Sequence, residues 1–214
     1  NRSDTWLRLG SLSISTIYED LFLIAISIFA VDKRVSRNIF TDCWTREFDI
    51  SIPVIELEKW ESVRGLWNKT MNFLTGDAWN INFRKSENLY SQRVRQSRNR
   101  IDISGCDVVS LFSGGLDSFC GAIDLLEQGK SPCLFGHNEY PKLRAKQEKL
   151  CEQFQNEYSS QTVDFLSFTA NSRAPFSNKL GRLAGSENTS RGRSLLFLCS
   201  ALTVAGILGD QTPV

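Results

Sequence analysis

The order of apolar and polar positions in residues 1–100 predicts a small α+β domain. The run "STIYEDLFLIAISIFAVDK" (15–33) is strongly apolar and predicts a helix that starts near Ser15 or Thr16. Residues 57–76 carry apolar side chains at steps of three and four, which predicts one amphipathic helix. The stretches "TREFDISIPVI" (45–55) and "AWNINFRK" (78–85) alternate apolar with polar residues, as half-buried strands do.

The rhythm changes after residue 100, where short apolar runs alternate with helical patterns. The expected strands are 107–112, 132–136 and 162–168, and the expected helices start near 118, 140 and 192. Strands that alternate with helices through short connections form right-handed crossovers and a parallel sheet. We therefore expect residues 101–214 to form an open α/β domain with helices on both faces of a parallel sheet. Because the chain opens on Asn1 and stops just after a long apolar helix, we also expect this domain to be truncated.

Composition narrows the function classes. The net charge of the 214 residues is +1, so no global field draws the protein to nucleic acid or to a membrane. Residues 84–100 hold a local basic stretch, read as a solvated linker between the two domains, with a contact to phosphate or RNA as the alternative. The apolar run Leu21–Val31 is too short to span a bilayer. We expect a cytoplasmic protein without a membrane partner.

The six cysteines indicate a reducing compartment. They include no C-x-x-C pair and no zinc-ligand spacing, which favours free thiols. Cys106, Cys120, Cys133 and Cys199 fall on predicted core faces, where thiols are usually inert. Inert thiols argue against a sulfur-transfer reaction.

The segment "VVSLFSGGLDSFCGAI" (108–123) is the part of the sequence that most strongly indicates a binding site. It runs from a strand into a helix, whose first N–H groups and positive dipole end favour an anion. Glycine pairs let the backbone approach phosphate oxygens closely. The tripeptide "GKS" at 129–131 is not a Walker A loop, because position 124 is Asp where that loop needs Gly.

The hexapeptide Ser-Gly-Gly-Leu-Asp-Ser closely resembles the PP-loop of the ATP pyrophosphatases. The resemblance implies that ATP, with Mg²⁺, is cleaved between its α and β phosphates while the loop holds the leaving pyrophosphate. The segment "SENTSRGRSLLFLCSAL" (186–202) is similar to the part of 7-cyano-7-deazaguanine synthases in which Gly-Arg-Asn opens a long helix. Here Ser194 replaces the Asn. With its N-terminal extension the chain resembles the QueC-like proteins of bacterial anti-phage operons, the QatC type.

This resemblance implies roles for particular residues. The expected catalytic residues are Asp117, Ser118 and Arg193, and the expected nucleotide contacts are Ser113, Gly114, Gly115, Leu116, Asp117, Ser118, His137 and Arg191. For Arg193 a solvated arginine at a helix start is the alternative, and for His137 a packed structural histidine. No metal ligand is expected in the chain, and a structural zinc only beyond residue 214.

The function expected from the resemblance is an ATP-dependent ligase of the QueC type. It would adenylate an acyl substrate, such as a deazaguanine carboxylate, release pyrophosphate, and form an amide or a nitrile in anti-phage defence. Other subunits of the same operon would bind through the N-terminal domain, and nucleic acid is not an expected partner. The alternatives are an ATP-binding sensor subunit, a ligase with an unrelated substrate, and a PP-loop tRNA-modifying enzyme.

Overall fold

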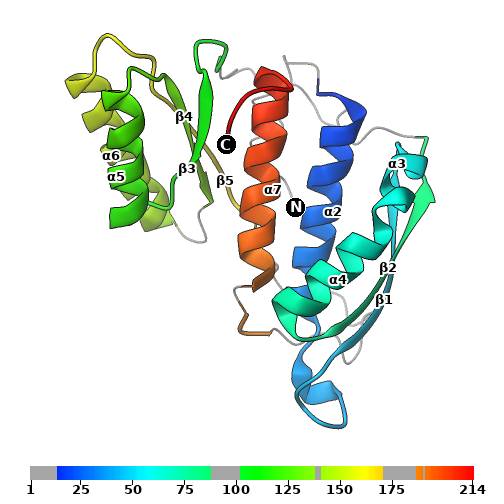
Figure 1. The fold of residues 1–214 in the computed structure, drawn as a ribbon. Coiled ribbons are helices and arrows are strands. Elements are labelled where there is room, and N and C mark those ends of the chain that lie inside the picture. Colours follow the sequence, from blue (N-terminus) through cyan, green and yellow to red (C-terminus); the bar gives the residue numbers. More distant parts are fainter. Residues whose placement is uncertain (1–13, 88–101, 138–140, 171–186, 190) are drawn as a thin grey trace. The chain divides into compact units, whose positions relative to one another are not determined.

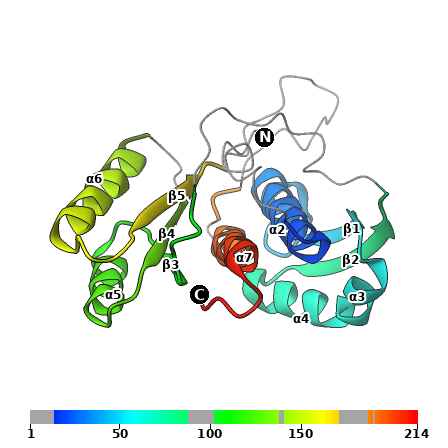
Figure 2. The same ribbon diagram turned by 90° about the horizontal axis from the view of Figure 1, so that it is seen from above.

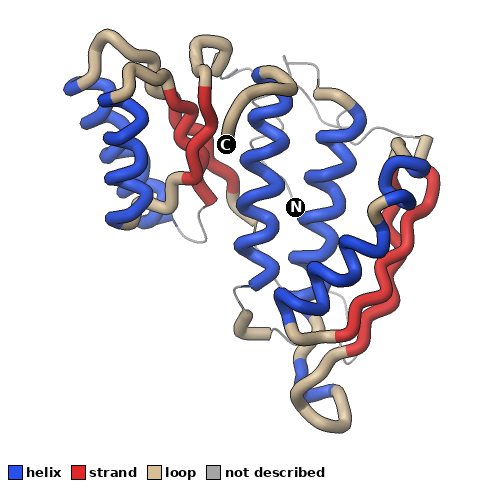
Figure 3. Tube along the Cα trace, in the orientation of Figure 1, coloured by secondary structure: helices blue, strands red, loops and turns tan. Residues whose placement is uncertain are grey.

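The computed structural model describes residues 14–87, 102–137, 141–170, 187–189 and 191–214. It is an α/β protein with two short parallel sheets (Figures 1 and 3). Its residues group into two compact units, each assembled from separate stretches of chain. Unit 1 comprises Asn1–Tyr18, Tyr90–Asn171 and Phe197–Val214, and unit 2 comprises Glu19–Leu89 and Ser172–Leu196. This grouping differs from the division expected from the sequence, which has one domain in residues 1–100 and another in residues 101–214.

Unit 2 holds the sheet formed by β1 (Glu47–Val54) and β2 (Ala78–Lys85), which pair in parallel along their whole length. Its apolar face presents the buried side chains of Phe48, Ile52, Val54, Trp79, Ile81 and Phe83. The opposite face carries mostly exposed polar residues such as Asp49 and Asn80. Helix α2 (Thr16–Arg34) supplies further buried apolar side chains, among them Ile24 and Ile28. Strand β2 has the bounds that the alternating pattern predicts, and β1 lies within the predicted stretch 45–55.

The connection between β1 and β2 is two helices rather than the single one expected. Helix α3 (Leu57–Ser62) ends at Val63, and α4 (Arg64–Thr75) starts directly after it. Side chains of these helices accept hydrogen bonds from alternate N–H groups at the outer edge of β2. Asn72 Oδ1 accepts from Trp79 N at 2.7 Å, Asn68 Oδ1 from Ile81 N at 2.8 Å, and Glu61 Oε1 from Phe83 N at 3.3 Å. Polar helix residues thus close this sheet edge, which would otherwise be open to another strand.

A buried charge network ties α2 to the sheet in unit 2. The fully buried Arg46 guanidinium lies 2.6 Å from Asp32 Oδ1 and 2.6 Å from Asp77 Oδ2. Arg37, in the short 3₁₀ helix η1 (Arg37–Ile39), donates to the same Asp77 carboxylate at 2.7 Å. Burial alone would raise the pKa of Asp77, but hydrogen bonds from Arg46 outweigh it and hold the pKa below its usual value. Each charged side chain of this network, Asp32, Arg46, Asp77 and Arg37, therefore has an opposite partner.

Unit 1 holds the second parallel sheet, with strand order β3–β4–β5. The strands are β3 (Val108–Leu111), β4 (Pro132–His137) and β5 (Asp164–Phe168). Helices α5 (Leu116–Glu127) and α6 (Pro141–Glu157) connect them and lie on one face (Figure 2). Between these helices and the sheet lies a core of Phe112, Ala122, Leu126, Leu134, Cys151, Phe154 and Val163. The expected strand and helix order is confirmed here.

Helix α7 (Arg191–Leu208) contributes its C-terminal part, Phe197–Leu208, to unit 1 on the other face of the sheet (Figure 2). The Phe197 ring lies 6.0 Å from that of Phe135 on β4. Among the described residues α7 is the one helix long and apolar enough to cross a membrane by length and composition.

The residues after α7 return to the free edge of β3. Val109 N donates to Pro213 O at 3.0 Å, on the edge opposite to β4. The chain therefore leaves β3 for α5 on one face, and it comes back beside β3 after α7 on the other face. Such a reversal is a topological switch point, where open α/β sheets form a crevice at the carboxyl ends of their strands.

Candidate functional site

The loop Ser113–Ser118 lies at this switch point, between the end of β3 and the start of α5. Gly114 has φ +78°, a left-handed conformation that glycine adopts without strain. Gly115 is extended and caps α5, with no side chain to bond the first turn. In the part of the chain that the structure describes, no acceptor is bonded to the N–H groups of Leu116, Asp117 and Ser118. These open donors, at the positive end of a helix dipole, suit an anion.

Two hydroxyl groups add further polar atoms to the loop. Ser113 Oγ and Ser118 Oγ lie 3.1 Å apart, and Ser118 Oγ donates to Gly115 O at 3.0 Å. Gly115 N donates to Ser113 Oγ at 3.3 Å. Asp117 and Leu116 are exposed, with Leu116 at 76%. The structure therefore brings together all six loop residues expected from the sequence.

Gln147 on α6 supports this loop and was not expected from the sequence. Its side chain is fully buried, and its Nε2 donates to Phe112 O at 2.9 Å, directly before Ser113. A Cβ at Gly114 would lie 3.1 Å from Gln147 Cγ, and one at Gly136 would lie 3.2 Å from Nε2. Gln147 Oε1 is buried with no hydrogen-bond partner. The signal was present in the sequence, since Gln147 falls on the apolar face of α6 between Leu143 and Leu150, where a polar side chain is unusual.

His137 ends β4 at the same edge of the sheet as the loop, on the next strand. It is buried, and its ring lies 4.8 Å from that of Phe168 and 6.4 Å from that of Phe197. These contacts place the imidazole on the α7 face, whereas Gly136 faces Phe165 and Gln147. The surroundings are those of a packed histidine, and a contact with nucleotide stays a prediction.

The two expected arginines belong to the other compact unit. Arg191 and Arg193 both lie in the stretch Ser172–Leu196 of unit 2, and both are exposed. Arg191 Nη1 donates to Thr75 O, and Arg191 N donates to Thr189 Oγ1 at 3.3 Å. Unit 1 by itself thus contains the loop but neither of these two guanidinium groups. The catalytic role expected for Arg193 stays a prediction.

The thiols differ from expectation at one position. Cys106, Cys133, Cys151 and Cys199 are buried, but Cys120 is exposed on α5, as Cys43 is in unit 2. The expectation of a core position for Cys120 was wrong, because α5 buries Ala122 and Leu126 and turns Cys120 outward. The described residues hold no group of three Cys, His, Asp or Glu side chains arranged for a metal ion.

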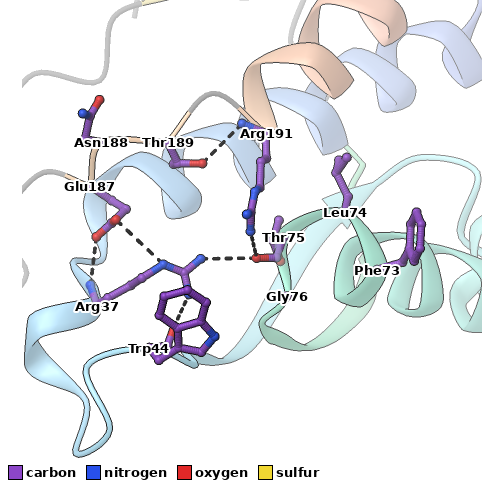
Figure 4. A pocket seen from close by; sticks show the side chains of 10 residues that line it. All are labelled: Arg37, Trp44, Phe73, Leu74, Thr75, Gly76, Glu187, Asn188, Thr189 and Arg191. Carbon is purple, nitrogen blue, oxygen red and sulfur yellow. Dashed lines mark hydrogen bonds and ion pairs between the residues drawn. The ribbon is translucent and has the colours of Figure 1, made fainter.

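Unit 2 holds a pocket of about 540 Å³ that the sequence analysis did not find (Figure 4). Arg37, Trp44, Thr75, Glu187 and Arg191 are among the residues that line it. Comparison of the chain with protein-family models, with curated proteins and with solved structures yields no match.

Proposed function

We propose that unit 1 binds ATP through the loop Ser113–Ser118 in a PP-loop-like fold and directs the reaction to the α-phosphate. The observation that carries this proposal is the set of open N–H groups at the start of α5, next to the paired hydroxyls of Ser113 and Ser118. The loop lies at the carboxyl end of β3, with β4 on one side and Pro213 on the other. Phosphate groups bind at such helix N-termini.

The loop has no lysine, but it suits a leaving pyrophosphate because it offers several hydrogen-bond donors from backbone N–H and hydroxyl groups. In the proposed reaction a carboxylate oxygen of the acyl substrate attacks the α-phosphorus. The bond from that phosphorus to the α,β-bridging oxygen breaks, and its electron pair leaves with pyrophosphate. Donors already in place stabilise this charge as it develops. An amine then attacks the acyl carbon, and AMP leaves.

In this proposal Asp117 would hold the Mg²⁺ that accompanies ATP. It is exposed in the first turn of α5, beside the open N–H groups. Oxygen ligands of this kind suit Mg²⁺, which is usually bound through one or two carboxylates together with substrate phosphates. By the resemblance of the loop to PP-loop enzymes, we propose a deazaguanine-type carboxylate as substrate, cytoplasmic location and a role in anti-phage defence.

The test is the release of pyrophosphate and AMP by the full-length protein with ATP, Mg²⁺ and a 7-carboxy-7-deazaguanine substrate. We expect both products in equal amounts, and a loss of at least about 100-fold in Asp117→Asn and Ser118→Ala. Asp124→Asn, on an exposed position of the same helix, and Ser160→Ala, exposed elsewhere in unit 1, are the matched controls.

Three results would count against the proposal. ADP and phosphate as products would place the cleavage at the wrong bond. ATP binding without turnover would favour a sensor subunit. Salt-sensitive binding of tRNA, with turnover only in its presence, would favour a tRNA-modifying enzyme, for which the exposed Cys120 is an available thiol.

A further inference from the structure

The pocket in unit 2 is bordered by an indole that the chain holds in an exposed position. Trp44 is 73% exposed, although large aromatic side chains are usually buried to a high degree. Its backbone is fixed on both sides: Asp42 Oδ1 accepts from Trp44 N at 3.0 Å, and Arg37 Nη1 donates to Trp44 O. The exposed ring is therefore not a consequence of a loose chain.

The residue before Trp44 shows backbone strain. Cys43 has φ +51°, and among the described residues it is the one non-glycine residue with positive φ. Asp42 holds the turn by accepting bonds from Trp44 N and from Thr45 N. These N–H groups lower the pKa of the Asp42 carboxyl, so the turn is held at neutral pH. Strained backbone of this kind concentrates at sites with a function.

The second feature of the pocket is the guanidinium of Arg191, which has no carboxylate partner among the described residues. Arg37 is saturated, because it bonds Asp77, Thr75 O and Trp44 O and faces Glu187. Arg191 donates one N–H to the same Thr75 O and, within the described part of the chain, makes no ion pair. Figure 4 shows the Arg191 side chain extending to Thr75, and its other guanidinium N–H groups have no hydrogen-bond partner among the described residues. Two guanidinium groups on one carbonyl oxygen repel each other, which an anion would offset.

We propose that this pocket binds a small aromatic anion, with its flat ring on the indole of Trp44 and its carboxylate or phosphate on Arg191. Guanidinium recognises such groups through paired N–H donors, and aromatic rings stack on indole. The pocket volume of about 540 Å³ suits a ligand of one or two fused rings with a polar substituent. All the residues of this site belong to unit 2, and the proposal does not depend on ATP chemistry at the loop of unit 1.

The experiment compares matched probes on the full-length protein. Tryptophan is replaced by 5-fluorotryptophan, and the ¹⁹F signal of residue 44 is assigned with Trp44→Phe and followed during titration. We expect 2-naphthoate to shift this signal saturably. We expect 2-naphthamide, which lacks the charge, and cyclohexanecarboxylate, which lacks the aromatic ring, to bind at least about fivefold more weakly. Inorganic phosphate reports whether the charge alone is enough.

Variants then assign the contacts by calorimetric titration with 2-naphthoate. Arg191→Gln should weaken binding about tenfold and Trp44→Ala about fivefold. Arg64→Gln and Leu66→Ala change exposed residues of α4 that do not line the pocket, and they should leave the affinity unchanged. Equal affinity for 2-naphthoate and 2-naphthamide in the unaltered protein would overturn the proposal, and this comparison does not depend on the folding of any variant.

Discussion

Gln147 Nε2 donates to Phe112 O at 2.9 Å, and this bond joins α6 to the last residue before the loop Ser113–Ser118. The two residues are 35 positions apart in the chain, and both are fully buried. The bond fixes the direction in which the chain leaves β3. A change at Gln147 therefore acts on the position of the loop, although Gln147 is not itself one of the loop residues expected to contact a nucleotide.

Gln147→Met removes this donor while nearly conserving the side-chain volume. Phe112 O then stays buried without its partner, so we expect the free energy of unfolding to fall by about 1–2 kcal/mol. Removal of the unpartnered Oε1 offsets part of that cost. Urea unfolding measures the change, with Lys149→Met on the exposed side of α6 as control. We expect ATP affinity to fall as well. An unaltered affinity would mean that Gln147 serves packing alone.

Two glycines near the start of α5 should respond to alanine in opposite directions. Gly114 has φ +78°, and a Cβ there would lie 3.1 Å from Gln147 Cγ. Gly114→Ala should therefore destabilise the protein by about 1–2 kcal/mol. Gly121 lies inside α5, and a Cβ there would meet no atom within 4 Å. Gly121→Ala should stabilise by about 0.5–1 kcal/mol, because alanine favours the helix. Thermal unfolding of both variants checks the two signs, and equal signs would contradict this account of the loop.

The sequence predicted the local elements well because their signals are local. Alternation gave the location of β1 and the bounds of β2, and the Ser-Gly-Gly pattern placed the loop between a strand and a helix. Alternation tells which face of a strand is buried, but not which strand lies beside it. The parallel pairing of β1 with β2 and the contact of Val109 with Pro213 therefore needed the structure.

The candidate sites were predictable to different degrees for the same reason. The six loop residues are contiguous, so one motif contains them all. Gln147 donates to a carbonyl 35 residues away in the chain. The only local sign of this bond in the sequence is a polar residue on the apolar face of a helix. The pocket of unit 2 combines Trp44 with Arg191. No spacing rule joins such distant positions, and nothing in the sequence marked Cys43 as strained.

Asp77 gives unit 2 a defined response to acid. Its folded pKa is lowered, so its contribution to stability is complete above the unfolded carboxyl pKa of about 3.9 and is lost as the pH falls through the folded value. At pH 7, Asp77→Asn should cost about 3 kcal/mol, because Arg37 and Arg46 lose a shared partner. The difference between parent and variant should shrink below about pH 4. Urea unfolding from pH 2 to 7 measures it, with Asp49→Asn, an exposed carboxylate of β1, as control. A difference that grew on acidification would rule out this role.

The cysteines should separate into two reactive and four protected thiols. Cys43 and Cys120 are exposed, whereas Cys106, Cys133, Cys151 and Cys199 are buried. Burial raises the pKa of Cys151 and of Cys199 to about 12, so at pH 8 only about one in 10⁴ of either group is thiolate. A hydrogen bond with Cys106, together with burial, raises the pKa of Cys133. We therefore expect a disulfide reagent at pH 8 to label two thiols within minutes in the folded protein and all six in denaturant. Cys43→Ser and Cys120→Ser should each remove one fast equivalent. Fast labelling of a third thiol would show that the core of unit 1 opens more readily than its packing implies.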